Sequence, residues 1–89
     1  MDLGEMIKDY RRKYALSQRE FGERIGITKE MISYIETYSK TAGNKVLRKV
    51  ALELQLPIIE VSAANLEQNI KVDKLRNIKR GEWKWTTRK

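Results

Sequence analysis

The chain of 89 residues contains no cysteine and no histidine. Without cysteine there can be no disulfide and no thiolate metal ligand. Without histidine the chain lacks a side chain that commonly ligates metals and transfers protons in catalysis. The sequence also shows no glycine-rich phosphate loop and no acid–base constellation. We therefore expect a protein that is not an enzyme and that uses no metal or other cofactor.

Long apolar runs are absent as well. No stretch approaches the roughly 20 apolar residues that a helix needs to span a bilayer. The first ten residues, MDLGEMIKDY, are too acidic and too poor in apolar residues for a secretory signal. Together with the absence of cysteine, this predicts a soluble, cytoplasmic protein without a membrane partner.

Charge is distributed unevenly along the chain. The sequence has 19 Lys and Arg against 12 Asp and Glu, for a net charge of +7. Residues 71–89 hold eight of these bases and only two of the acids, so nearly all of the net charge lies in the last fifth of the chain. Such a run is either a solvated face or a segment that contacts an acidic partner, and nucleic acid is one such partner.

Residues 17–36, SQREFGERIGITKEMISYIE, form the stretch around which the rest of the chain is organised. Ser17 and Glu20 have the S-x-x-E spacing of a capping box, in which each side chain satisfies a backbone N–H group at the start of a helix. We therefore expect a helix to begin at Gln18. Its inward positions are one helical turn apart: Phe21 and Ile25.

The second half of this stretch predicts another short helix after a tight turn. Gly26 supplies the left-handed residue that commonly ends a helix, and Thr28 can cap the next one. Ile32 and Ile35 would then face inward. Two helices this short, joined by so short a turn, match the crossing of a helix-turn-helix.

These residues carry a family resemblance. The runs IKDYRRKYA, LSQREFGERIGITKEMISYIE and VLRKVALELQL resemble the helix-turn-helix of Cro and repressor proteins, the XRE family, over residues 3–61. The resemblance implies an all-α fold, a compact five-helix lambda-repressor-like DNA-binding domain. The chain departs from the family pattern at three places: Gly22 where a residue like alanine is usual, Thr37-Tyr38-Ser39 where a glycine is usual, and Ala42-Gly43-Asn44 where a proline is common.

The flanking segments predict the remaining helices. Apolar spacing favours a first helix over residues 2–14 and a fourth helix capped by Asn44. Proline is favoured at the first position of a helix, so Pro57 predicts the start of a fifth helix. The apolar residues with which this helix would close the bundle are Ile58, Ile59, Val61, Ala64 and Leu66. We therefore divide the chain into a helix-turn-helix domain, residues 1–66, and a basic extension, residues 67–89.

Double-stranded DNA is the partner that the resemblance implies. Helix-turn-helix proteins place the second helix of the motif in the major groove, where its first residues reach base edges. The predicted DNA-binding residues are Ser17, Gln18, Arg19, Thr28, Lys29, Glu30, Met31, Ser33, Tyr34, Lys40, Thr41 and Asn44. The resemblance also implies a structural ion pair between Arg11 and Glu36, which would tie the first helix to the end of the reading helix.

The basic extension allows several interpretations. Val72, Leu75 and Ile78 recur every third residue, which favours a short helix ending near Gly81. Trp83 and Trp85 then alternate with polar residues as in a strand, and a lone strand needs a partner. We predict that these tryptophans mediate homodimerisation. The alternatives are a basic arm that enters a DNA groove and a tail without either role.

The function that these patterns favour is a sequence-specific transcriptional regulator, a dimeric repressor on a two-fold operator. An overlapping alternative is an antitoxin-type regulator that binds a partner protein through residues 71–89. A third is a protein-interaction module without DNA readout, which the positive net charge disfavours.

Overall fold

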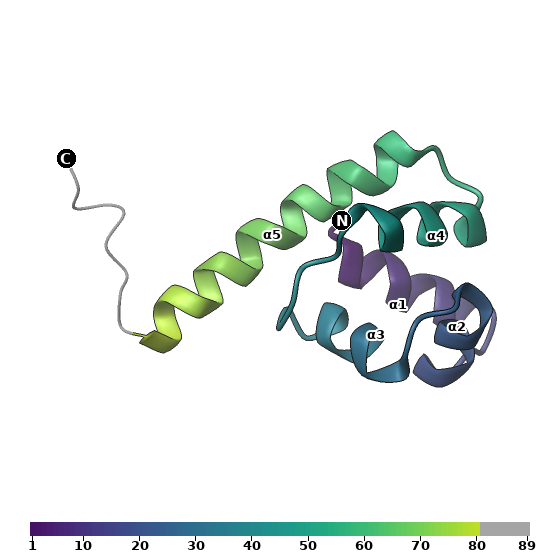
Figure 1. Ribbon diagram of the computed structural model, residues 1–89, viewed down its shortest axis with the longest axis horizontal. Coiled ribbons are helices and arrows are strands. Elements are labelled where there is room, and N and C mark those ends of the chain that lie inside the picture. The colour runs from purple at the N-terminus through teal and green to yellow at the C-terminus, as the bar shows by residue number, and fades with distance from the viewer. Residues whose placement is uncertain (81–89) are drawn as a thin grey trace.

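The structure, a computed structural model, describes residues 1–80 of the chain. The described part contains five helices and no strand, which confirms the all-α class (Figure 1). The helices in chain order are α1 (Leu3–Lys13), α2 (Gln18–Ile25), α3 (Lys29–Glu36), α4 (Asn44–Leu54) and α5 (Ile58–Arg80). The predicted strand, with Trp83 and Trp85, lies outside the described residues.

Helix α1 occupies the middle of the bundle. In Figure 1 it lies between the α2–α3 pair and the α4–α5 pair. Its first turn is closed by a capping box, because the Asp2 carboxylate accepts from the Glu5 N–H at 2.9 Å and the Glu5 side chain accepts from the Asp2 N–H at 3.0 Å. The basic residues of its last turn suit the negative end of the helix dipole.

The core is formed by one apolar side chain or more from every helix. The fully buried members are Leu3, Ile7, Phe21, Ile32, Ile35, Val50, Val61 and Val72. A polar contact at its edge joins α1 and α2 to α4, because the Glu53 carboxylate accepts from Tyr10 of α1 at 2.8 Å and from Arg24 of α2 at 2.9 Å. The hydrogen bond from Arg24, with that from Tyr10, lowers the pKa of Glu53.

The prediction that Asn44 caps α4 is wrong. The capping position is Gly43, whose backbone is extended with φ −86° and ψ 174°, and Asn44 is already the first helical residue. No side chain accepts a hydrogen bond from the free N–H groups at this end. The chain therefore enters α4 one residue earlier than the preference of asparagine for caps indicated.

Helix α5 differs from the prediction in length and in facing. The two helices predicted for this region are one continuous helix of 23 residues, since neither glycine nor proline interrupts the chain between Pro57 and Gly81. Val61 and Ala64 face the core as expected. The other three residues that were expected to close the bundle are exposed instead: Ile58, Ile59 and Leu66.

Candidate nucleic-acid interface

The turn between α2 and α3 is built by local signals. Ser17 Oγ accepts from the Glu20 N–H at 3.0 Å, and the Glu20 carboxylate accepts from the Ser17 N–H at 2.8 Å, so the predicted capping box is confirmed. Gly26 ends α2 in the left-handed conformation, with φ 73°. Thr28 Oγ1 then accepts from the Met31 N–H at 3.1 Å and caps α3.

Gly22 is required by the closeness of the turn. The N–H of Ile27 donates to the Gly22 carbonyl at 2.8 Å, which brings the turn backbone onto α2. A Cβ atom at position 22 would lie only 2.4 Å from the carbonyl oxygen of Ile27. Because the Cβ is attached directly to the α2 backbone and the oxygen belongs to the backbone of the turn, the contact could be relieved only by moving the turn against α2. This chain therefore needs glycine where the family usually has a slightly larger residue.

Helix α3 presents its first turn to solvent. Thr28, Lys29 and Glu30 are exposed, whereas Ile32 and Ile35 on the opposite face are fully buried. One turn later Tyr34 is exposed and Ser33 is half-buried. Met31 is half-buried and packs against the core, so a smaller part of its side chain is exposed to solvent than of Lys29 and Glu30.

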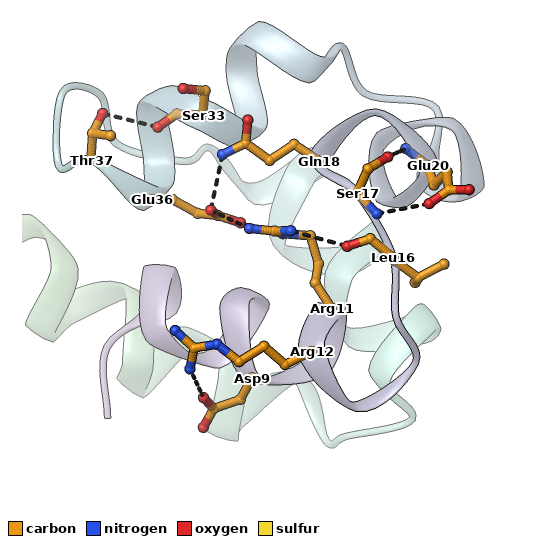
Figure 2. Close-up of polar contacts among 10 residues, drawn as sticks. All are labelled: Asp9, Arg11, Arg12, Leu16, Ser17, Gln18, Glu20, Ser33, Glu36 and Thr37. Atoms are coloured by element: carbon orange, nitrogen blue, oxygen red, sulfur yellow. Dashed lines mark hydrogen bonds and ion pairs between the residues drawn. The ribbon is translucent and has the colours of Figure 1, made fainter.

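A buried carboxylate holds the end of α3 against α1 and α2. Arg11 donates to both oxygens of Glu36, from Nε and from Nη2, each at 2.8 Å, while its Nη1 donates to the Leu16 carbonyl at 3.0 Å (Figure 2). Glu36 is only 3% exposed. The hydrogen bond to Glu36 raises the pKa of Arg11, so the guanidinium stays charged at every ordinary pH.

Gln18 belongs to the same cluster. Its Nε2 donates to Glu36 Oε1 at 3.0 Å, so the first residue of α2 is fixed to the last residue of α3 (Figure 2). This leaves its other amide hydrogen and its carbonyl oxygen for a ligand. The structure thus brings together Arg11, Gln18 and Glu36, which the sequence had assigned to two separate roles.

The loop after α3 carries further predicted residues. Lys40 lies with its ammonium 4.8 Å from the centre of the Tyr34 ring, a cation–π contact that joins the loop to α3. Thr41 and Asn44 are exposed, as are Ser17 and Arg19 at the start of α2. Exposed bases on these elements, Arg19, Lys29 and Lys40, alternate with exposed acids of α2 and α3, namely Glu20, Glu23 and Glu30, so the surface carries charges of both signs.

A second polar cluster joins the loop after α3 to α1 and α5, and the sequence analysis did not predict it. Tyr38, at φ 62°, donates from its hydroxyl to Asp2 at 3.1 Å, and Lys71 of α5 donates to the same carboxylate. Burial alone would raise the pKa of Asp2, but the hydrogen bonds from Lys71, the Glu5 N–H and Tyr38 outweigh it and lower the pKa. No local pattern predicts contacts between residues this far apart. The D-x-x-E spacing of Asp2 and Glu5 predicts the cap of α1, but it does not predict the contacts of Asp2 with Tyr38 and Lys71.

Other kinds of site were sought in the described residues. Over residues 1–80, no group of three His, Cys, Asp or Glu side chains is placed to hold a metal ion. None of the helices in that range is both long enough and apolar enough to cross a membrane.

Comparison with known proteins agrees with the geometry. A helix-turn-helix family model matches residues 7–61, which include α2, the turn, α3 and α4. No curated protein and no solved structure matched the chain significantly.

Proposed function

Because the chain belongs to the Cro/C1-type helix-turn-helix family of DNA-binding transcription regulators, we propose that it is a sequence-specific repressor that binds a two-fold operator as a dimer. The observation that carries this proposal is the first turn of α3, which is exposed on one side, on a helix whose inner face is buried at Ile32 and whose last residue, Glu36, is bonded to Arg11 and Gln18. A reading helix must be held in this way, because a small displacement would misplace every base contact.

The side chains of this turn suit the edges of base pairs. Lys29 can donate to the O6 and N7 acceptors of guanine, and Glu30 can accept from the amino group of cytosine. Ser33 and Tyr34 follow one turn later and extend the contact along the groove. We expect Met31 to contribute less, since part of its side chain packs against the core.

A second set of residues would position the domain on the phosphates without reading sequence. Ser17 and Thr28 use their oxygens as caps, so each hydroxyl can still donate to a phosphate. Arg19 lies in the first turn of α2, and Lys40 and Thr41 lie in the loop after α3. The amino end of α4, with Asn44, has no side-chain cap, so its N–H groups are available to an anion.

A dimer of this kind can repress transcription by binding DNA alone. Repression requires only that a bound dimer occludes a promoter in the cytoplasm. With two reading helices related by a two-fold axis, the operator half-sites would lie about one helical turn apart.

The test is selection of bound sequences from random duplex DNA, followed by footprinting of the enriched duplex at physiological salt. Salt must be fixed because non-specific binding is largely electrostatic. We expect enrichment of an inverted repeat and two protected half-sites. Enrichment of no sequence would overturn the proposal.

A further inference from the structure

Helix α3 ends in a turn that usually contains glycine. The N–H of Ser39 donates to the Tyr34 carbonyl at 2.8 Å, and the N–H of Tyr38 donates to the Ile35 carbonyl at 3.3 Å. These two bonds form a Schellman motif, whose left-handed residue is most often glycine. Here that residue is Tyr38, with φ 62°. Because a Cβ atom destabilises the left-handed conformation, it persists only where other contacts stabilise it.

The side chain of Tyr38 supplies such contacts. Its hydroxyl donates to Asp2 at 3.1 Å, and the ammonium of Lys71 lies 5.5 Å from the centre of its ring. Lys71 also donates to the carboxylate of Asp2, which is fully buried. Burial, together with the hydrogen bond to Asp2, raises the pKa of Tyr38, so the hydroxyl keeps the proton that it donates. The loop after α3 is thus joined to the start of α1 and to α5 (Figure 1).

The end of α3 does not by itself require a tyrosine. Glycine would form the same turn without strain. What the tyrosine adds is an attachment of the loop to two other helices. The next residues include Lys40 and Thr41, which are exposed and which we expect to contact phosphates. Backbone strain that surrounding contacts maintain is concentrated at binding sites, so this strain indicates a role in binding.

We propose that Tyr38 is a positioning residue for DNA binding: its contacts with Asp2 and Lys71 fix the loop after α3 so that Lys40 and Thr41 reach the phosphates beside the reading helix. A loop that is already fixed binds without the entropy cost of becoming ordered. Because phosphate contacts carry no sequence information, Tyr38 affects the affinity for every duplex and leaves base discrimination unchanged. This inference rests on the proposed function.

The first experiment measures the affinity of the full chain for the selected operator and for random duplex over a range of salt concentrations. Tyr38→Phe keeps the ring and removes only the hydroxyl that donates to Asp2. Tyr38→Gly keeps the turn and removes the whole side chain. We expect both variants to bind every duplex about 10-fold more weakly. The slope of log affinity against log salt should become shallower by about 0.9 for each phosphate that Lys40 no longer neutralises.

The matched control is Tyr14→Phe, which removes a hydroxyl from a half-exposed tyrosine at the end of α1 and should change neither quantity. Partial unfolding lowers the concentration of active protein but not the number of phosphates that a folded copy neutralises, so the slope separates positioning from lost stability. The inference is overturned if either Tyr38 variant keeps the affinity and slope of the wild type, loses affinity with an unchanged slope, or discriminates less well among operator variants.

A second experiment tests the contribution of α5. Lys71→Met removes the ammonium that contacts Tyr38 and Asp2, whereas Lys74→Met removes an exposed charge one turn later on the same helix. Both variants lose one positive charge, so we expect the salt slope to fall more for Lys71→Met and to recover in Lys71→Arg. Equal falls for Lys71→Met and Lys74→Met would show that charge alone acts, and would overturn the role of Lys71.

The outcomes separate this inference from the proposed function. A chain that selects an operator, and binds it equally well as Tyr38→Phe and Tyr38→Gly, refutes this inference alone. A chain that selects no sequence, yet has a shallower salt slope on random duplex in both variants, refutes the sequence-specific function and supports the positioning of the loop. A wild type that binds no duplex refutes both.

Discussion

The helix-turn-helix and α5 are stabilised in opposite ways. Helices α2 and α3 have eight residues each, and both are capped and fixed to their neighbours by Gly26, Thr28 and the contacts of Glu36. Helix α5 is almost three times as long, and apolar side chains on its outer face, such as Ile59 and Leu66, are largely exposed. The motif is therefore held by polar contacts and caps at its ends, while α5 is held by the apolar and polar side chains of its inner face.

Among the substitutions that test this comparison, Arg11→Met should lower the free energy of unfolding the most. The substitution leaves the carboxylate of Glu36 buried with only Gln18 as a side-chain donor, and breaking a buried pair from one side costs about 3–5 kcal/mol. We expect the free energy of unfolding, measured by urea titration, to fall by about that amount. The control is Arg12→Met, because Arg12 is 76% exposed and its pair with Asp9 lies at the surface. An unchanged midpoint for Arg11→Met would show that the motif is not held by this pair.

A smaller loss is expected from Gly22→Ala. The added Cβ would meet the Ile27 carbonyl, so the turn must move, at a cost of about 1–3 kcal/mol. The comparison variant is Gly43→Ala, which has open space around the new Cβ and should lose only what a poorer cap at the start of α4 costs. Thermal unfolding of both variants measures the difference. If the two variants melt alike, the turn is not as tight as the structure indicates.

A stabilising change is available at α4. Gly43→Ser would supply the missing cap and should raise the free energy of unfolding by about 0.5 kcal/mol. Asn44→Ala, by contrast, should leave stability within about 0.5 kcal/mol of the wild type, because Asn44 does not cap the helix. A clear loss from Asn44→Ala would restore asparagine as the cap.

The smallest expected effect is a change in pH dependence where α5 meets the loop after α3. The folded-state pKa of Asp2 is lowered, so its stabilising contribution is full above the ordinary aspartate pKa and is lost as the pH falls below about 4. Asp2→Asn should therefore show a shallower loss of melting temperature between pH 5 and pH 3 than the wild type. Parallel curves for the two proteins would mean that Asp2 is not held by Lys71 and Tyr38.

The motif could be predicted from sequence because its signals are local. The Ser17–Glu20 spacing, Gly26 and Thr28 each act within four residues, so pattern and structure agree. The contacts of Gln18 with Glu36 and of Tyr38 with Asp2 join residues 18 and 36 positions apart, and only the folded chain shows them.

Helix α5 was mispredicted for a physical reason. Its inner face includes two buried polar residues, Asn65 and Gln68, which bond to the backbone of Ala42, Gly4 and Ile35. These residues interrupt the apolar period that marks a buried helix face. The exposed Ile59 and Leu66 meanwhile supplied apolar positions that were assigned to the core.

The most direct test of the central claim, that the first turn of α3 reads DNA sequence, compares Lys29→Ala with Arg19→Ala on the selected operator, on its single-base-pair variants and on random duplex. We predict that Lys29→Ala loses about 1–3 kcal/mol on the operator and stops discriminating at one position of each half-site, while Arg19→Ala weakens binding to all duplexes alike. Equal weakening by Lys29→Ala on every duplex would contradict the claim.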